Sequence, residues 1–114
     1  MKQNLKEYML LQTEKLLSIP SPTGYTKEVS ECLVKELQSM GYAPYTLNKG
    51  GVICALNEGE NALMLAAHVD TLGAMVCAIN GDGTLKFDRI GGPILPTYDG
   101  EYCLYMPAYN STPT

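Results

Sequence analysis

The hydrophobic periodicity of the chain changes once, near residue 42, and this change limits what the chain can fold into. Apolar residues recur at helical spacing over residues 3–18 and 26–40, which predicts two amphipathic helices. Pro20 follows the first helix, and Gly41 suits the C-terminal end of the second. The period then becomes two, which predicts strands over residues 42–47, 52–56, 73–79 and 84–90. Two helices followed by several strands indicate an α/β chain.

A further strand, residues 62–67, is the one that we expect to be buried. It is a continuous apolar run, bounded by Asn61 and a polar stop. Residues 52–56 and 73–79 are nearly as apolar, which suits burial on both faces of a sheet. Because only two helices are available as cover, at least one sheet face or edge should be exposed. We therefore expect the isolated chain to self-associate or aggregate.

The length and composition of the chain limit the classes of protein to which it can belong. The chain has 114 residues, about one domain, and a net charge of −4 without a Lys/Arg cluster, which argues against nucleic acid as a partner. No apolar run reaches membrane-spanning length, and the N-terminus lacks the pattern of a signal peptide, so we expect no membrane partner and a cytoplasmic location. The four cysteines, three of them within helix or strand patterns, are expected to be buried free thiols.

His68, the only histidine, and Asp70 stand at the end of the apolar run. Side chains two apart on a strand project to the same side, about 6–7 Å apart along the backbone. A neutral imidazole ligates metals, and a nearby carboxylate fixes which ring nitrogen carries the proton. However, a catalytic zinc needs about three protein ligands, and the sequence near His68 does not obviously supply them. The spacing alone therefore leaves open an ordinary capped turn with a surface histidine.

The order and wording of these segments resemble the M42 family of metal-dependent aminopeptidases. The resemblance covers about residues 3–103. Its most specific part is the His-x-Asp motif followed by Leu72-Gly73-Ala74-Met75-Val76 and, later, by Ile90-Gly91-Gly92. The matching segments are Ser21-Pro22-Thr23-Gly24, residues 66–76, residues 85–92 and Gly100-Glu101-Tyr102-Cys103.

The resemblance implies a zinc-peptidase-type mixed sheet with N-terminal helices, followed by the start of an inserted β domain. Residues 1–72 would be the N-terminal part of the catalytic domain, and residues 73–114 the beginning of the inserted domain, cut short. It also implies two divalent metal ions, zinc or cobalt, that act on the N-terminal peptide bond of short peptides. His68 matches a metal ligand, and Asp70 matches the carboxylate that orients it.

Family members are longer, and their remaining ligands and general base lie beyond the inserted domain. We therefore expect an N-terminal fragment that binds metal weakly or not at all and is inactive alone, whereas the complete enzyme would be a homo-oligomer. One alternative is a related dinuclear metallohydrolase that acts on an N-acyl amino acid or a glycan. Another is a non-catalytic truncated product that associates through β edges, and a third is an unfolded pseudogene product.

Overall fold

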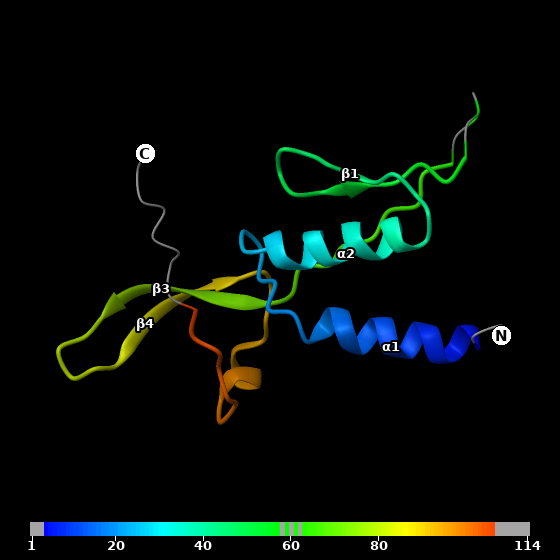
Figure 1. The fold of residues 1–114 in the computed structure, drawn as a ribbon. Helices are drawn as coiled ribbons and strands as arrows, with labels where there is room; N and C mark the ends of the chain where they lie inside the picture. The colour runs from blue at the N-terminus through cyan, green and yellow to red at the C-terminus, as the bar shows by residue number, and fades with distance from the viewer. Residues whose placement is uncertain (1–3, 58, 60, 62, 107–114) are drawn as a thin grey trace.

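The computed structural model describes residues 4–57, 59, 61 and 63–106, and Figure 1 shows the arrangement of their elements. The chain begins with two helices and continues as short strands, so the expected mixture of helices and strands is confirmed. The elements in order are α1 (Leu5–Leu17), α2 (Lys27–Ser39), β1 (Tyr45–Thr46), β2 (Val52–Ile53), β3 (Gly73–Ile79), β4 (Leu85–Ile90) and the 3-10 helix η1 (Leu95–Tyr98). None of the described helices is both long enough and apolar enough to cross a membrane.

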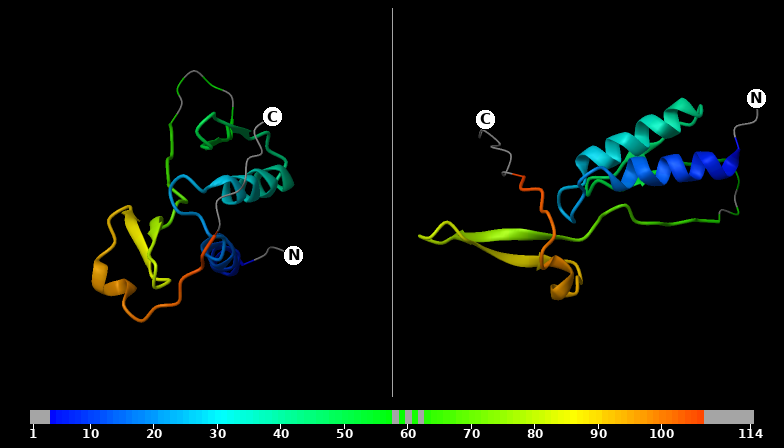
Figure 2. Two further views of the ribbon diagram at one scale, coloured as in Figure 1. Left: turned by 90° about the vertical axis from the view of Figure 1, so that its left-hand side faces the viewer. Right: turned by 90° about the horizontal axis from the view of Figure 1, so that it is seen from below.

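Helices α1 and α2 lie side by side and antiparallel, and polar contacts to one carboxylate join them (Figures 1 and 2). Glu36 on α2 accepts hydrogen bonds from Gln12 at 2.8 Å, Lys15 at 2.9 Å and Tyr8 at 3.1 Å, all on α1. The Lys15 and Tyr8 contacts lower the pKa of Glu36, which keeps this acceptor ionised. Asn4 caps α1 by accepting a hydrogen bond from the Lys6 amide.

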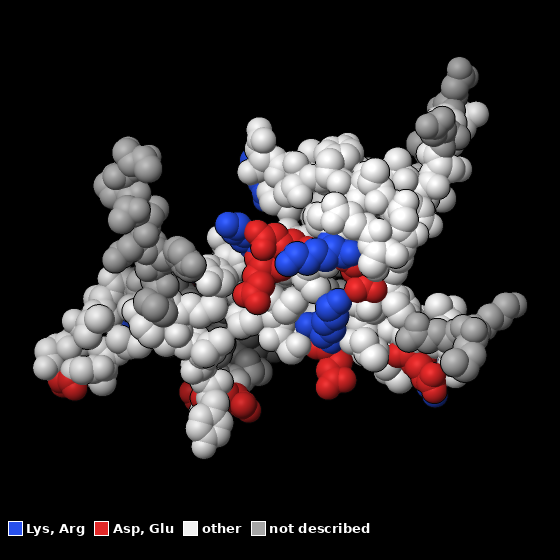
Figure 3. Space-filling model, viewed as in Figure 1, with Lys and Arg blue, Asp and Glu red and all other residues white. Residues whose placement is uncertain are grey.

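Acidic and basic side chains are interspersed over the two helices on the face shown in Figure 3. Besides the Lys15–Glu36 pair, Lys27 and Glu31 lie one helical turn apart on α2, with 3.9 Å between Nζ and a carboxylate oxygen. Charges on this face are therefore balanced locally rather than segregated by sign.

The strands form two separate two-stranded antiparallel sheets, β1 with β2 and β3 with β4. Strands β3 and β4 agree almost to the residue with the strands expected over residues 73–79 and 84–90, and in the turn that joins them Asp82 accepts hydrogen bonds from Thr84. The register shifts between Val76 and Ala78, which marks a bulge at Cys77. The strands expected over residues 42–47 and 52–56 shrink to two paired residues each.

Residues 62–67 are the clearest error of the sequence prediction. Ala62 lies outside the described residues, and residues 63–67 form no strand and are exposed. The exposed fractions of Leu63, Met64 and Leu65 are 88%, 85% and 84%. An apolar run becomes a buried strand only when neighbouring segments pair with its backbone and cover its faces, and no such segment lies beside it in the described part of the chain.

The core is correspondingly small. Val29 on α2 is the one fully buried apolar side chain among the described residues. The accessible surface of the chain is 10342 Å², whereas a compact monomer of 12.4 kDa exposes about 6,100 Å².

The cysteines are free as expected, but the prediction that they are buried is wrong: Cys77 and Cys103 are exposed, and Cys32 and Cys54 are half-buried. The predicted exposure of a sheet face is confirmed, since β3 and β4 are exposed over most of their length.

Candidate metal-binding site

The loop between the two helices lies against the segment that carries His68, although 47 residues separate them in sequence. The Thr71 amide donates to the Ser21 carbonyl at 2.8 Å, and Pro22 and Thr71 form an isolated parallel bridge. The Ser21 hydroxyl, which is fully buried, donates to the Val69 carbonyl at 3.0 Å. These contacts fix the backbone on both sides of Asp70.

The local sequence explains the shape of this loop. Pro20 stands just beyond α1, and Pro22 accepts a turn hydrogen bond from the Tyr25 amide at 2.7 Å. Gly24 has a φ of +92°, a conformation that favours glycine. Gly73 gives the loop room, because a Cβ at this position would lie 2.6 Å from the Pro22 Cβ. The Ser-Pro-Thr-Gly loop can therefore approach residues 68–73 closely.

Asp70 is held by one hydrogen-bond donor on each carboxylate oxygen. The Thr23 hydroxyl donates to Oδ2 at 2.6 Å, and Nδ1 of His68 lies 3.1 Å from Oδ1. The Thr23 contact, and to a smaller extent the His68 contact, lower the pKa of Asp70, while its partial removal from water acts in the opposite direction. Asp70 is therefore ionised at neutral pH and acts as an acceptor.

These contacts define the tautomer of the His68 ring. Nδ1 faces two acceptors, the Asp70 carboxylate at 3.1 Å and the Asp70 carbonyl at 3.2 Å. In a neutral imidazole, one nitrogen donates and the other accepts, so Nδ1 carries the proton here. Nε2 then keeps its lone pair, on a side chain that is 86% exposed. This is the form in which a histidine ligates a metal through Nε2.

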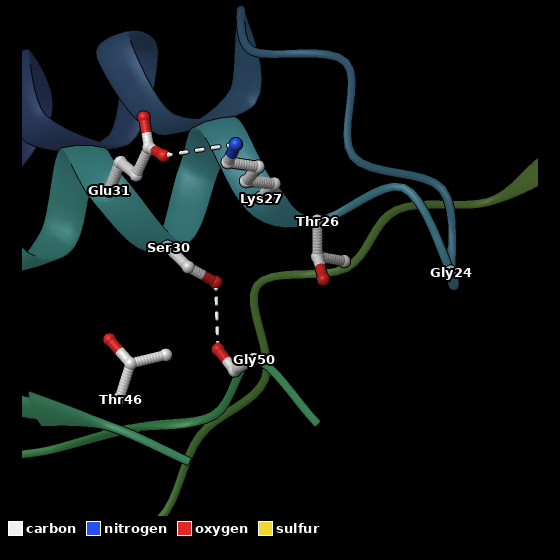
Figure 4. A pocket seen from close by; sticks show the side chains of 7 residues that line it. All are labelled: Gly24, Thr26, Lys27, Ser30, Glu31, Thr46 and Gly50. Carbon is white, nitrogen blue, oxygen red and sulfur yellow. Dashed lines mark hydrogen bonds and ion pairs between the residues drawn. The ribbon is translucent and has the colours of Figure 1, made fainter. Parts of the chain in front are cut away.

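His68 also borders a cavity of about 490 Å³ between the loop, α2 and the β1–β2 turn. Its wall comprises Thr23, Gly24, Thr26, Ser30, Leu33, Lys49, Gly50, Gly51, Val52, Ala67, His68, Val69 and Asp70. A second hollow of about 360 Å³ shares part of this wall and is shown in Figure 4. There, the Ser30 hydroxyl donates to the Gly50 carbonyl at 2.8 Å, which ties α2 to the β1–β2 turn.

The described residues supply one candidate metal ligand but not the full ligand set of a metal centre. Within the part of the chain that the structure describes, no three His, Cys, Asp or Glu side chains are grouped so that they could hold an ion. Both oxygens of Asp70 are already engaged by Thr23 and His68. A catalytic zinc needs about three protein ligands. His68 is therefore the one candidate that these contacts leave free to bind a metal.

Comparison with known proteins assigns the chain to a family. The family model described as M42 glutamyl aminopeptidase matches residues 50–108, which is just over half of the chain. The chain therefore belongs to the M42 family, as its motifs predicted.

Individual relatives agree with this assignment. YhfE of Bacillus subtilis, provisionally named an aminopeptidase, is 46% identical over 92 residues, which are 79% of this chain and 27% of that protein. The glutamyl aminopeptidase of Lactococcus lactis is 34% identical over 80 residues, 68% of this chain and 22% of the relative. A protein of Pyrococcus abyssi, provisionally named a LysW-lysine/LysW-ornithine hydrolase, is 37% identical over 71 residues, which are 60% of this chain and 21% of that protein. The chain thus spans about a quarter of the length of these relatives.

Sequence reasoning singled out His68 and Asp70 as side chains that project to the same side of a strand. The structure brings the two side chains together, although residues 63–70 form no strand. The sequence reasoning gave no separate role to the side chains of Ser21 and Thr23. In the structure, the side chains of Ser21 and Thr23 hold the segment around Asp70 in place through hydrogen bonds. The available signals were the two hydroxyls in a loop rich in Pro and Gly and the place of Ser21-Pro22-Thr23-Gly24 among the segments that resemble the family. No spacing rule connects such a loop to a motif 47 residues away.

Proposed function

We propose that this chain supplies His68, a metal ligand oriented by Asp70, to an M42-type aminopeptidase that removes N-terminal residues from short peptides. The observation that carries the proposal is the contact between Nδ1 of His68 and Asp70, which leaves Nε2 available. Two divalent ions, zinc or cobalt, would complete the centre. When bound, such ions supply Lewis-acid polarisation of a peptide carbonyl. The chain's own contribution is to hold one imidazole in the ligating tautomer.

The proposal retains the division at residue 72, with the catalytic part before it and the inserted β domain after it. By itself, the 114-residue chain would bind metal weakly and be inactive, because one histidine does not form a closed site. An assay with aminoacyl anilides should show no activity above background. Hydrolysis that is removed both by a chelator and by His68→Ala would contradict this.

Titration with zinc, followed through the ring resonances of the only histidine, tests the metal-binding role. We expect a weak, saturable shift that is weaker still in Asp70→Asn, because the substituted amide does not carry the charge that favours the ligating ring. Asp82→Asn is the matched control, since Asp82 also accepts hydrogen bonds from a threonine but lies in the hairpin turn. Unperturbed ring resonances at saturating zinc would remove His68 from the proposed metal centre.

A different substrate on the same type of centre is the main alternative within the hydrolases. The provisional name of the Pyrococcus abyssi relative refers to hydrolysis of LysW-lysine or LysW-ornithine, both of which contain an amino acid. This name favours an N-acyl amino acid over a glycan as the rival substrate. Parallel assays of a longer relative with a peptide and with an N-acyl amino acid would separate the two.

A second candidate function is association through a β edge. The observation that favours it is the exposure of the apolar residues Leu63, Met64 and Leu65 in a segment without a strand partner in the described structure. Exposed apolar segments of this kind pair with other chains. Sedimentation velocity over a concentration series tests it, and a strictly monomeric chain at all concentrations would contradict it.

A further inference from the structure

Thr23 connects the inter-helix loop to the ring of His68 through a chain of two hydrogen bonds. Its hydroxyl donates to Oδ2 of Asp70 at 2.6 Å, and Oδ1 of the same carboxylate lies 3.1 Å from Nδ1 of His68. Thr23 and Asp70 are 47 residues apart in the sequence. One carboxylate therefore faces a donor from the loop with one oxygen and the candidate metal ligand with the other.

The backbone of the loop presents the Thr23 hydroxyl in a fixed direction. The Tyr25 amide donates to the Pro22 carbonyl at 2.7 Å, so Thr23 and Gly24 are the two central residues of a β-turn. Gly24 has a φ of +92°, a positive value of the kind that a type II turn requires at its second central position. Branching at Cβ also restricts χ1 of a threonine. The donor is therefore already restricted in direction before it binds Asp70.

We propose that Thr23 is a positioning residue for the metal ligand: through Asp70, it holds the His68 ring with the proton on Nδ1 and the lone pair on Nε2. This inference rests on the proposed function at His68, and it adds a residue from outside the His-x-Asp motif. The terminal torsion of an aspartate has a broad distribution, so its carboxylate turns easily unless a second contact fixes it. The Thr23 hydroxyl is that contact on Oδ2, and it keeps Oδ1 directed at the ring.

The exposure of the two side chains makes this contact important. The side chain of Asp70 is 37% exposed and that of His68 is 86% exposed, so water competes for both groups, and packing does not hold the ring. The hydrogen bond at one ring nitrogen determines which tautomer a neutral histidine adopts, and such partners also set metal affinity. A carboxylate turned away would leave Nδ1 with the backbone carbonyl of residue 70, at 3.2 Å, as its acceptor.

Two substitutions at Thr23 separate the hydroxyl from the shape of the side chain. Thr23→Val keeps the branched shape and removes the donor, whereas Thr23→Ser keeps the donor and removes one methyl group. Thr23 is exposed, so neither change disturbs a packed core. Ser21→Ala is the matched control for a purely structural role, because it weakens the attachment of the same loop at the Val69 carbonyl and leaves the Asp70 carboxylate untouched.

Long-range proton–nitrogen correlation spectra of the metal-free chain give the first measurement. At a pH where the ring is neutral, we expect Thr23→Val to reduce the fraction of rings with the proton on Nδ1 and Thr23→Ser to restore most of it. Ser21→Ala should change this fraction less than Thr23→Val does. In an Asp70→Ala background, Thr23→Val should have no further effect, because Thr23 acts through the carboxylate.

Zinc titration of the ring resonances gives the second measurement. The dissociation constant should rise about threefold to tenfold in Thr23→Val, at or below the lower end of the roughly 10–100-fold that is typical when a direct partner of a metal-bound histidine is replaced. Thr23→Ser should stay close to the wild type.

The outcomes separate this inference from the proposed function. Equal protonation of Nδ1 in the wild type and Thr23→Val, equal effects of Thr23→Val and Ser21→Ala, or no rescue by Thr23→Ser would overturn the role of Thr23, even if zinc shifts the wild-type ring. Zinc that leaves the wild-type ring resonances unchanged would instead overturn the proposed function. The spectra of the metal-free chain would then still decide whether Thr23 orients the ring.

Discussion

Two neighbouring segments, residues 63–67 and residues 68–71, differ sharply in how the rest of the chain holds them. The first is the more hydrophobic, yet it is exposed and unpaired in the described structure. The second contains a histidine, an aspartate and a threonine, yet Ser21 and Thr23 attach it to the inter-helix loop through hydrogen bonds. Apolar character alone therefore does not order a segment, because order requires a partner at the right place.

The difference also separates two roles. The attached segment carries the candidate metal ligand, whose function needs a fixed orientation. The open segment is the one to which the proposed association through a β edge is assigned. Substitutions that remove the contacts between the loop and residues 68–73 should therefore detach residues 68–71 from the loop, so that their backbone becomes as open as that of residues 63–67.

Gly73→Ala should have the largest effect. The added Cβ would lie 2.6 Å from the Pro22 Cβ and push the loop away from the segment. We expect a loss of about 1–3 kcal/mol in the free energy of unfolding, together with faster exchange of the Thr71 amide. Urea unfolding and hydrogen exchange measure these effects. Gly92→Ala is the control, since nothing lies within 4 Å of a Cβ at that position. Equal stability of the two variants would show that the loop does not pack tightly against Gly73.

Ser21→Ala should have the next largest effect. It removes a buried hydroxyl and leaves the Val69 carbonyl without this donor, which costs about 1–2 kcal/mol. Ser39→Ala, which removes an exposed hydroxyl that donates to the Glu36 carbonyl, should stay within about 0.5 kcal/mol of the wild type. Both values follow from urea unfolding. A harmless Ser21→Ala would mean that the backbone contacts alone attach the segment.

Thr23→Val should have a small effect, visible mainly in titration. Because the Thr23 hydroxyl is the main cause of the lowered pKa of Asp70, its loss should raise this pKa toward the ordinary range. A carboxyl group whose pKa is lowered by folding stabilises the fold above its unfolded pKa, and this contribution is lost as the pH falls through the folded pKa. Stability should therefore fall less on acidification in the variant.

Carboxyl resonances of Asp70 followed against pH by NMR give the measurement. Thr13→Val serves as the control, because the Thr13 hydroxyl donates to a helix carbonyl and not to a carboxylate. If the pKa of Asp70 were the same in Thr23→Val and Thr13→Val, the hydrogen bond from Thr23 would not be formed in solution.

The sequence predicted what depends on local pattern. Helices expected over residues 3–18 and 26–40 appear as Leu5–Leu17 and Lys27–Ser39, and the β3–β4 hairpin agrees closely because turn chemistry and period act within a few residues. His68 and Asp70 also lie close together as expected, although the strand on which that expectation rested is not formed by residues 63–70. By contrast, burial of residues 62–67 depends on other segments, and the roles of Ser21 and Thr23 depend on a contact between distant parts of the chain. Neither kind of information is present in local periodicity.

The tautomer of His68 is the most direct test of the central claim, that Asp70 orients this ring and leaves Nε2 free to bind a metal. Long-range proton–nitrogen correlation spectra, recorded at a pH where the ring is neutral, give the protonation of each nitrogen, and assignment is direct because the chain has one histidine. The structure predicts a proton on Nδ1 and a bare Nε2, with this preference weakened in Asp70→Ala, which removes the carboxylate and leaves only the backbone carbonyl of residue 70 as an acceptor for Nδ1. A ring protonated mainly on Nε2 in the wild-type chain would contradict the account.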